Sequence, residues 1–331
     1  MKAIRVAKCG GPEELQLQEV AQPKPGAGEA LVRVLAAGVN YADIYFRNGA
    51  IPRPTPFPFT LGIEGAGVVE AVGEGVTELK RGDRVAYAST SGAGRWSVGS
   101  YAEYDVVKAV HLAPLPDGVS FHDGAAIVLQ GLTAHYLVHE FYPIKRGSTV
   151  LVHAAAGGMG LLLVQWVKHM GAVVIGTVST DEKARIAREA GADNVILYTK
   201  QDFAEEVKKL TGGAGVDYVI DGVGKTTFTK NLDALKPRGW ATVFGMASGP
   251  ADPLVPNSLM MKSLTISGGA FANYTATRDE LLRRARDVFA GLREGWLKLR
   301  IDRTFPLAQA AEAHQLIESR QTAGKLILKI H

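Results

Sequence analysis

Apolar residues follow two different patterns along this chain, and the pattern changes near residue 122. Before that point, short runs alternate apolar and polar side chains and are bounded by Gly, Pro or Asp, which is typical of strands joined by tight turns. The runs are residues 2–7, 15–20, 29–36, 65–72 and 83–88. Many short strands separated by such turns predict a compact, barrel-like β domain.

From residue 123 to about residue 268, apolar runs alternate with segments of helical periodicity. The runs at 149–154, 172–178, 194–197, 216–221, 239–244 and 263–267 predict six strands of an α/β, doubly wound parallel sheet. Helices over 277–291 and 307–319 and a closing strand over 324–330 are expected to follow. We expect this tail to return to the first domain, which gives one domain of residues 1–122 and 269–331 and another of residues 123–268.

The first apolar run of the parallel sheet leads into a small-residue turn and then into a helix. The turn places Ala155, Gly157 and Gly160 in the spacing of the G-x-G-x-x-G pattern, with Ala in the first position. Small residues let backbone N–H groups at a helix N-terminus approach a pyrophosphate, and the next strand follows one helix later, as in a βαβ unit. We therefore predict a dinucleotide site; the alternative is a plain tight turn. The expected contacts are Gly157, Gly158 and Met159.

Composition and charge exclude several classes of protein. The 331 residues are 47% hydrophobic and 21% charged, which is ordinary for a soluble globular enzyme. The net charge of +4 arises from basic and acidic residues spread along the chain, so a nucleic-acid partner is not indicated. Cys9 is the single cysteine, so a disulfide framework and a cysteine zinc cluster are excluded. The sequence has no apolar run of about 18 residues and no signal-peptide pattern, which predicts no membrane span and a cytoplasmic protein.

Several separated stretches resemble one enzyme superfamily. They are residues 36–49, 61–67, 99–104, 130–134, 154–160 and 313–320. Together they are similar to the medium-chain dehydrogenase/reductase superfamily and, within it, to the zinc-free quinone oxidoreductase (zeta-crystallin-like) group. The resemblance implies a Rossmann domain joined to a GroES-like β-barrel catalytic domain, and an enzyme that reduces a quinone with NADPH.

Two positions bear on whether this chain binds zinc. The zinc-dependent alcohol dehydrogenases of the superfamily carry a Cys ligand where Asn40 stands and a His ligand where Ile63 stands. An amide and a hydrocarbon do not replace thiolate and imidazole on zinc. A Gly- and Ser-rich segment, residues 89–99, takes the place of the four-cysteine zinc lobe. We expect no metal site, and therefore reduction of an electron-poor acceptor rather than oxidation of a simple alcohol.

The end of the second parallel strand predicts which nicotinamide cofactor is used. An NAD-selective site places a carboxylate there, whereas this chain has Val178, so nothing at that position repels a 2′-phosphate. By the resemblance, the residues expected at the ribose and its phosphate are Thr177, Ser179, Lys183 and Tyr198. The alternative for Lys183 is a solvated helix charge, and Asp181 and Glu182 suit the first turn of that helix.

The other cofactor contacts are expected at strand ends, because ligands of open parallel sheets bind at the carboxyl edge. By strand position or by the resemblance, these residues are Asn40, Gln130, Thr133, Val223, Phe244, Gly245, Ser248, Gly269, Ala270, Phe271 and Lys325. For Gln130 and Thr133 the alternative is helix capping or hydrogen bonding between the domains.

A helix that begins near Asn40 is expected to line the cleft between the domains. Asn40 and Tyr45 are the candidate catalytic residues, because an amide and a phenol can hydrogen-bond a carbonyl oxygen. Asp43 and Arg47 are spaced i, i+4 and predict an ion pair on the helix surface. His153, on the first parallel strand, is expected to be buried and hydrogen-bonded.

Three functions stay open. The leading prediction is an NADPH:quinone oxidoreductase, followed by an NADPH-dependent enoyl or alkenal double-bond reductase, and then by a nucleotide-bound RNA-binding or structural crystallin-like protein. The apolar segment 258–267 ends the parallel sheet, so pairing with a second copy in a homodimer is expected.

Overall fold

The computed structural model describes residues 1–331 except 53–55, 89, 93–94 and 97–98. The chain divides into two compact units. Unit 1 consists of Met1–Leu132, Phe271–Ala290 and Leu299–His331, and unit 2 of Thr133–Ala270 and Gly291–Lys298. Neither unit is therefore one continuous stretch of sequence.

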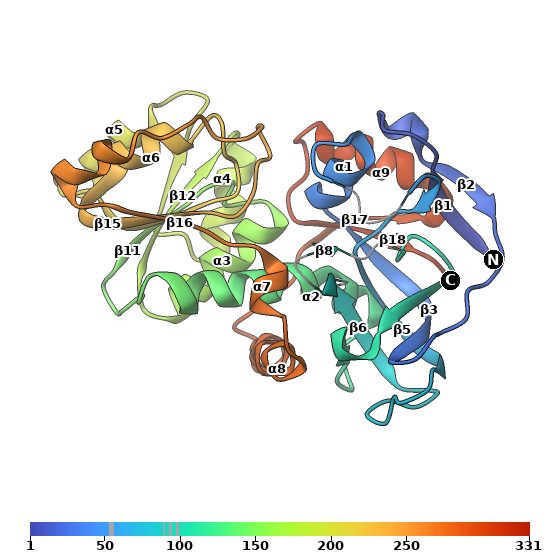
Figure 1. Cartoon of the computed structure of the whole chain (residues 1–331). Helices are drawn as coiled ribbons and strands as arrows, with labels where there is room; N and C mark the ends of the chain where they lie inside the picture. Colours follow the sequence, from blue (N-terminus) through green and yellow to red (C-terminus); the bar gives the residue numbers. More distant parts are fainter. Residues whose placement is uncertain (53–55, 89, 93–94, 97–98) are drawn as a thin grey trace. The chain divides into compact units, whose positions relative to one another are not determined.

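Unit 2 is built on a parallel sheet with the strand order β13-β12-β11-β14-β15-β16. Strands β11, β12, β15 and β16 of this sheet are labelled in Figure 1. The strands are β11 (Thr149–Val152), β12 (Val173–Val178), β13 (Asn194–Leu197), β14 (Val216–Asp221), β15 (Leu235–Val243) and β16 (Thr265–Gly268). The chain builds outward from β11 in one direction and then from β14 in the other, which is the doubly wound Rossmann order. The predicted α/β fold with a doubly wound parallel sheet is confirmed.

Amphipathic helices connect these strands. They are α3 (Gly158–His169), α4 (Asp181–Glu189), α5 (Phe203–Leu210) and α6 (Phe228–Ala234). Thr180 and Asp202 cap α4 and α5, because their side chains accept hydrogen bonds from backbone N–H groups of the first turn. Phe203 and Val207 of α5 pack with Leu151 of β11 in the core of unit 2.

Unit 1 contains a larger and a smaller sheet. The larger sheet has β3 (Glu29–Val39), β5 (Glu64–Val72), β6 (Arg84–Ala88), β9 (Tyr104–Lys108), β10 (Leu112–Pro114), β17 (Ile301–Pro306) and β18 (Lys325–Lys329). The smaller sheet has β1 (Lys2–Val6), β2 (Gln16–Glu19) and β4 (Phe59–Thr60). Strand β3 pairs antiparallel with β5, β9 and β18, so the C-terminal tail completes the sheet that the N-terminal segment begins.

The core of unit 1 follows the alternation of the sequence. Ala30 and Val32 of β3 point to the same side of the sheet and pack with Val69 of β5 and Val85 of β6. The intervening polar side chains of these strands, such as Arg33, are less buried. The predicted alternation of burial holds over residues 32–36 of β3, whereas residues 36–39 and most of β6 are buried on both faces.

The remaining helices complete the chain. They are α1 (Tyr41–Asn48), α2 (Phe121–Tyr136), α7 (Phe271–Tyr274), α8 (Arg278–Glu294) and α9 (Ala310–Glu318), with shorter turns η1 (Pro12–Glu14), η2 (Ala109–His111), η3 (Leu137–Phe141), η4 (Pro256–Lys262) and η5 (Leu307–Gln309). Unit 1 also contains a short hairpin, β7 (Thr90–Gly92) with β8 (Arg95–Trp96). Across the described ranges, no helix is both long and apolar enough to span a bilayer.

Candidate functional site

The predicted dinucleotide cradle lies at the carboxyl end of β11. Ala154 adopts a left-handed φ of 51°, which ends the strand, and its carbonyl oxygen accepts a hydrogen bond from the Gly157 N–H at 2.9 Å. Gly157 is the N-cap residue of α3, and no described side chain caps this helix. A Cβ atom on Gly160 would lie 2.2 Å from the Ala154 carbonyl oxygen, so a glycine is needed for α3 to pack this close. The first N–H groups of α3 are available to an anion.

The end of β12 carries Val178 and Ser179 rather than a carboxylate, and Lys183 follows in the first turn of α4. Val178 is buried at the strand end, Ser179 and Lys183 are half-buried, and Tyr198 is 46% exposed after β13. The Tyr198 N–H donates to the Val178 carbonyl oxygen at 3.1 Å, so the two strand ends lie together.

Both acidic residues in the first turn of α4 have basic partners. Asp181 pairs with Lys200 at 2.9 Å, and Glu182 pairs with Arg185 at 2.7 Å. These ion pairs reduce the negative charge that either carboxylate would present to a 2′-phosphate.

Strands β14 and β15 end in loops that are tied to each other. Asp221, fully buried at the end of β14, accepts hydrogen bonds from the N–H groups of Val223 at 2.7 Å and Gly224 at 3.1 Å. The Ser248 hydroxyl donates to the Val223 carbonyl oxygen at 2.9 Å. The carboxyl edge of the parallel sheet thus carries the predicted residues Val223, Phe244, Gly245, Ser248, Gly269 and Ala270.

His153 is buried and hydrogen-bonded, as predicted. Its Nδ1 atom lies 2.9 Å from the Thr177 hydroxyl, and its Nε2 atom lies 2.7 Å from the side-chain oxygen of Asn231. Asn231 in turn donates to Asp221 at 2.6 Å. Desolvation by burial lowers the pKa of His153, so the ring stays neutral. Thr177, also predicted at the cofactor, is 2% exposed, and its hydroxyl already contacts His153.

In unit 1, Asn40 belongs to a buried cluster with Glu64 and Lys325, which we call the Asn40 cluster. Lys325 Nζ donates to Asn40 Oδ1 and to Glu64 Oε2, each at 2.6 Å, and Asn40 Nδ2 donates to Glu64 Oε2 at 2.9 Å. The other Glu64 oxygen accepts the Leu129 N–H at 2.7 Å. These three side chains come from the N-cap of α1, from β5 and from β18, and each is at most 6% exposed.

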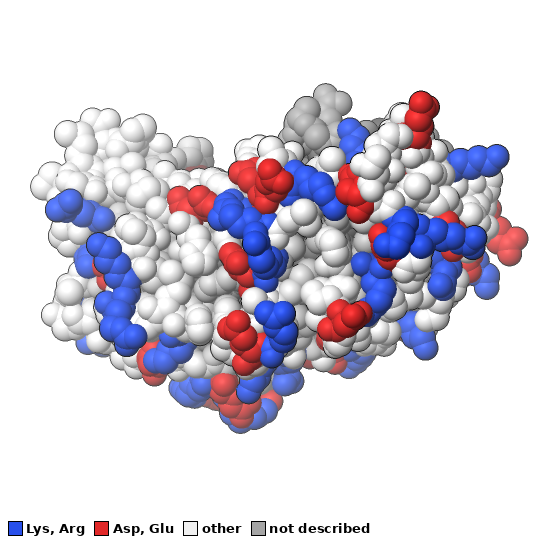
Figure 2. Space-filling view, turned by 90° about the horizontal axis from the view of Figure 1, so that it is seen from below, with Lys and Arg blue, Asp and Glu red and all other residues white. Residues whose placement is uncertain are grey.

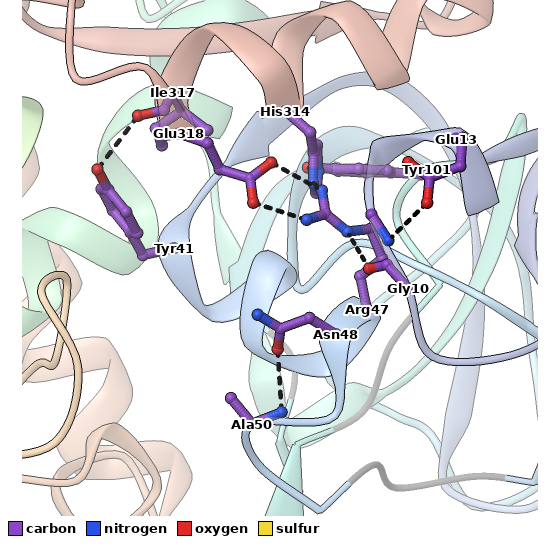
Figure 3. A network of polar contacts seen from close by, with 11 residues as sticks. Gly10, Glu13, Tyr41, Arg47, Asn48, Ala50, Tyr101, His314, Ile317 and Glu318 are labelled. Carbon is purple, nitrogen blue, oxygen red and sulfur yellow. Dashed lines mark hydrogen bonds and ion pairs between the residues drawn. The ribbon is translucent and has the colours of Figure 1, made fainter.

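The expected surface ion pair between Asp43 and Arg47 is wrong. Both side chains of α1 are buried, at 0% and 1% exposure. Arg47 forms a bidentate pair with Glu318 of α9, at 2.7 and 3.1 Å, and donates to His314 Nδ1 at 2.9 Å (Figure 3). The i, i+4 spacing predicts a pair on a free helix face, but α9 covers this face of α1 and supplies the partner.

Asp43 lies one turn before Arg47 on α1. Its Oδ2 atom accepts the Asn40 N–H at 2.9 Å and the Tyr101 hydroxyl at 3.2 Å. Desolvation raises the pKa of Asp43 to about 7, against the lowering effects of the Asn40 N–H and Lys325. Burial, with the Arg47 charge, lowers the pKa of His314 to about 3.

The other four predicted site residues lie in helices. Tyr45 is half-buried on α1, with its ring 6.3 Å from that of Tyr41. Gln130 and Thr133 lie in α2, and Phe271 is buried at the start of α7. Residues 53–55 of the proline-rich loop, and residues 89, 93–94 and 97–98 of the Gly- and Ser-rich segment, lie outside the described residues.

Sequence reasoning missed the roles of Glu64, Tyr101 and His314. Each lies inside a stretch that carries the family resemblance, and each is a polar residue among apolar or small neighbours. That combination was the available signal, since a buried polar group needs a hydrogen-bond partner elsewhere in the fold.

Asn40 and Ile63 occupy the positions at which zinc-dependent relatives carry ligands. Ile63 is fully buried and offers no donor atom. Among the described residues, no three His, Cys, Asp or Glu side chains are grouped so that they could hold a metal ion.

Comparisons with known proteins identify the family of this chain. Residues 26–117 match the family model of the alcohol dehydrogenase GroES-like domain, and residues 158–287 match that of the zinc-binding dehydrogenase domain. A quinone oxidoreductase of Pseudomonas aeruginosa is 42% identical over 99% of both chains, and a 2-haloacrylate reductase of a Burkholderia species is 42% identical over 98% of both. The structure of Escherichia coli quinone oxidoreductase complexed with NADPH superposes with a TM-score of 0.95 at 39% identity, covering both chains completely. The chain therefore belongs to the quinone oxidoreductase group of the medium-chain dehydrogenase/reductase superfamily.

Proposed function

We propose that this protein is an NADPH-dependent quinone oxidoreductase. In the reaction, a quinone takes up a hydride from NADPH and a proton from solvent to give a hydroquinone and NADP⁺. The observation that carries the proposal is the carboxyl edge of the parallel sheet. There the N-terminus of α3 has no side-chain cap, and β12 ends at Val178 without a carboxylate. The chain is also 42% identical to a quinone oxidoreductase.

The residues of unit 2 fit a phosphorylated dinucleotide. The N–H groups of Gly157, Gly158 and Met159 would hold the pyrophosphate at the N-terminus of α3. Ser179, Lys183 and Tyr198 would surround the 2′-phosphate, since Asp181 is already paired with Lys200. Further contacts are proposed from Thr177, Val223, Phe244, Gly245, Ser248, Gly269, Ala270 and Phe271, and from Asn40, Gln130, Thr133 and Lys325.

The acceptor oxygen would be oriented by Asn40 and Tyr45. One Nδ2 hydrogen of Asn40 is held by Glu64, whereas the other makes a contact of 3.4 Å to the Gly38 carbonyl oxygen, which is at the limit of a hydrogen bond. That weakly bonded hydrogen is the one that would donate to the carbonyl oxygen of the acceptor. The Lys325 ammonium on Asn40 Oδ1 polarises the amide and strengthens this donor. Water can protonate the product, because the oxyanion of a reduced quinone is delocalised.

A second candidate function is reduction of an activated carbon–carbon double bond. The 2-haloacrylate reductase of Burkholderia, 42% identical over nearly the whole chain, favours it. The two functions share the hydride donor and differ in the acceptor, so the choice of acceptor distinguishes them.

An RNA-binding role is the least favoured alternative. On the face shown in Figure 2, Lys and Arg side chains are interspersed with Asp and Glu rather than gathered in a basic stripe. A phosphate backbone is bound by clustered basic side chains, and this face does not provide them.

The test is steady-state oxidation of NADPH and of NADH, followed by loss of nicotinamide absorbance. The acceptors are p-benzoquinone, phenanthrenequinone, an α,β-unsaturated ketone and 2-chloroacrylate, each with and without a chelator. We expect turnover of a quinone with NADPH that the chelator does not change. Faster turnover of the unsaturated acceptors would move the protein to the double-bond reductases, and loss of activity with chelator would contradict the zinc-free assignment.

Cofactor choice is tested with a matched pair of variants. Lys183→Glu places a negative charge beside the proposed 2′-phosphate and is expected to raise the KM for NADPH at least tenfold while sparing NADH. Lys208→Glu, an exposed charge change on α5, is the control and should leave both KM values unchanged. Equal effects on NADPH and NADH would remove Lys183 from the phosphate site.

We also propose that the protein forms a homodimer through the edge of the parallel sheet. Strand β16 is the last strand on that side, and η4 beside it exposes Met260 at 69% and Met261 at 93%. An unpaired strand edge next to exposed apolar side chains favours association with a second copy about a two-fold axis.

A further inference from the structure

The buried charges of unit 1 do not balance. Around the N-terminus of α1 the chain buries two carboxyl groups, Asp43 and Glu64, at 0% exposure, and one ammonium, Lys325, at 3%. Glu64 and Lys325 form the ion pair of the Asn40 cluster at 2.6 Å. Arg47 is paired with Glu318 at 2.7 Å and neutralises that side chain instead. An ionised Asp43 would therefore be an uncompensated buried charge, which is costly.

The hydrogen-bond directions around Asp43 follow from donor chemistry. Arg47 can only donate, so His314 Nδ1 accepts its hydrogen bond and the ring carries its proton on Nε2. That N–H donates to the Tyr101 hydroxyl oxygen at 3.2 Å, and the Tyr101 O–H donates to Asp43 Oδ2 at 3.2 Å. The backbone N–H of Asn40 donates to the same oxygen at 2.9 Å. Both hydrogen bonds that Asp43 accepts, from the Asn40 N–H and from the Tyr101 hydroxyl, therefore end on its Oδ2 atom.

The other oxygen of Asp43 is where a proton can reside. Oδ1 is buried and has no hydrogen-bond partner among the described residues. Protonation there leaves the two hydrogen bonds to Oδ2 in place. Desolvation, together with the nearby Glu64 charge, holds the pKa of Asp43 at about 7, whereas the Asn40 N–H, Lys325 and Tyr101 act to lower it. Tyr101 and His314 do not titrate in this range, because burial raises the pKa of the phenol and lowers that of the imidazole to about 3.

We infer that Asp43 is a positioning residue that holds a proton on Oδ1 and thereby sets the net charge of the Asn40 cluster when the cofactor binds. The inference rests on the proposed function, in which Lys325 and Asn40 contact NADPH. With Asp43 protonated, Glu64 and Lys325 are balanced. With Asp43 ionised, the same region carries one extra negative charge beside the residues that receive a polyanionic cofactor. Binding of NADPH and protonation of Asp43 therefore favour each other, and this coupling is reciprocal.

The inference is tested first by calorimetry of NADPH binding to the whole protein. Titrations near neutral pH in buffers of different ionisation enthalpy give the number of protons taken up. We expect the wild type to take up a larger fraction of a proton than Asp43→Asn, which carries no titratable group at this position. Protonation of the NADPH phosphate is common to both proteins and cancels in the comparison.

The second measurement is the pH dependence of NADPH affinity. From about pH 6 to about pH 8 the wild-type Kd should rise roughly fivefold more than that of Asp43→Asn, which should keep the tighter value throughout. Tyr101→Phe removes a donor that stabilises the ionised form, so its midpoint should move to higher pH, and this variant keeps the inference testable if Asp43→Asn does not fold. The KM for NADPH in steady-state assays should follow the Kd.

Asp105→Asn is the matched control. Asp105 is a second buried carboxyl of unit 1 whose pKa desolvation raises to about 7, but its partner is Tyr87 and it is outside the Asn40 cluster. Its replacement should leave proton uptake and the affinity profile as in the wild type. Equal uptake and equal pH slopes in the wild type and Asp43→Asn would overturn the inference while leaving the proposed function intact. Absence of NADPH binding at every pH would overturn the proposed function and the inference with it.

Discussion

A buried carboxyl group makes stability depend on pH in an unusual direction. Desolvation raises the pKa of Asp105 on β9 from 3.8 to about 7, against the effect of the Tyr87 hydroxyl, which donates to it at 2.9 Å. Between these two pKa values the folded protein keeps the proton and the unfolded chain releases it. The contribution of Asp105 to folding is therefore most favourable below about pH 4 and is lost as the pH rises toward 7.

Asp105→Asn should remove this pH dependence. We expect the Tm of the variant, relative to the wild type, to be higher at about pH 8 than at about pH 5, with each kcal/mol appearing as roughly 2–4 °C. Thermal unfolding of both proteins in matched buffers measures the difference. The buried histidines have lowered pKa values and act in the opposite direction below about pH 6.5, but they are present in both proteins. A Tm difference that stays constant with pH would contradict the prediction.

The burial of a side chain was more predictable from sequence than the identity of its hydrogen-bond partner, as His153 shows. Asn40 was expected at the start of a helix, and it is the N-cap of α1. The partner of Arg47, by contrast, was misassigned to Asp43, four residues before it. His314 and Glu318 contact Arg47 from 267 and 271 positions away, and helix periodicity carries no information about a second helix so distant in sequence.

Among the elements, the turn from β11 into α3 has two glycines with different physical roles. A Cβ on Gly160 would meet the Ala154 carbonyl oxygen at 2.2 Å, so it would push the helix away from the strand. A Cβ on Gly157 would have its nearest neighbour at 3.3 Å, and φ is −76° there, so the fold can accept it. That Cβ would instead occupy space in the proposed pyrophosphate site.

These roles predict different results for two alanine variants. Gly160→Ala should lower stability by about 1–3 kcal/mol, as overpacking does, and also weaken NADPH binding. Gly157→Ala should keep the wild-type Tm within about 2 °C and still raise the Kd for NADPH roughly tenfold or more. Thermal unfolding and a fluorescence titration with NADPH separate the two. A Gly157→Ala protein that binds NADPH as the wild type does would remove this residue from the cofactor site.

Element types were more predictable than element ends. Alternation and apolar runs predicted the strands of both units, because burial of one or both faces imposes those patterns. The ends depend on tertiary contacts. The run at 149–154 ends as strand at Val152, since Ala154 turns into the left-handed region, and the run at 239–244 begins as strand at Leu235. The helix expected over 307–319 starts as the short turn η5 before α9.

For the whole molecule, the exposed methionines of η4 are the clearest sign of association. Met260 and Met261 are among the most exposed large apolar side chains of the described residues, and they lie next to the edge strand β16. Exposed apolar side chains at a strand edge favour self-association in water.

Replacement of both methionines by lysine should therefore give a monomer. We expect light scattering to show a dimer for the wild type and half that mass for the Met260→Lys, Met261→Lys double variant, with far-ultraviolet circular dichroism unchanged. Val110→Lys is the control, because Val110 is 40% exposed in η2 of unit 1, which does not contain the parallel sheet. A wild type that is monomeric over the whole concentration range would contradict the dimer.

The pairing of β18 with β3 has a consequence for how the protein is made. Lys325 of β18 and Asn40 beside β3 are 285 positions apart, so the ribosome synthesises unit 2 almost entirely before the strand that completes unit 1 emerges. Domains fold as units during synthesis. The nascent Rossmann unit can therefore fold first, while β3 still lacks its partner β18 and Glu64 still lacks Lys325. The Asn40 cluster is thus completed late in folding, after Lys325 has been synthesised.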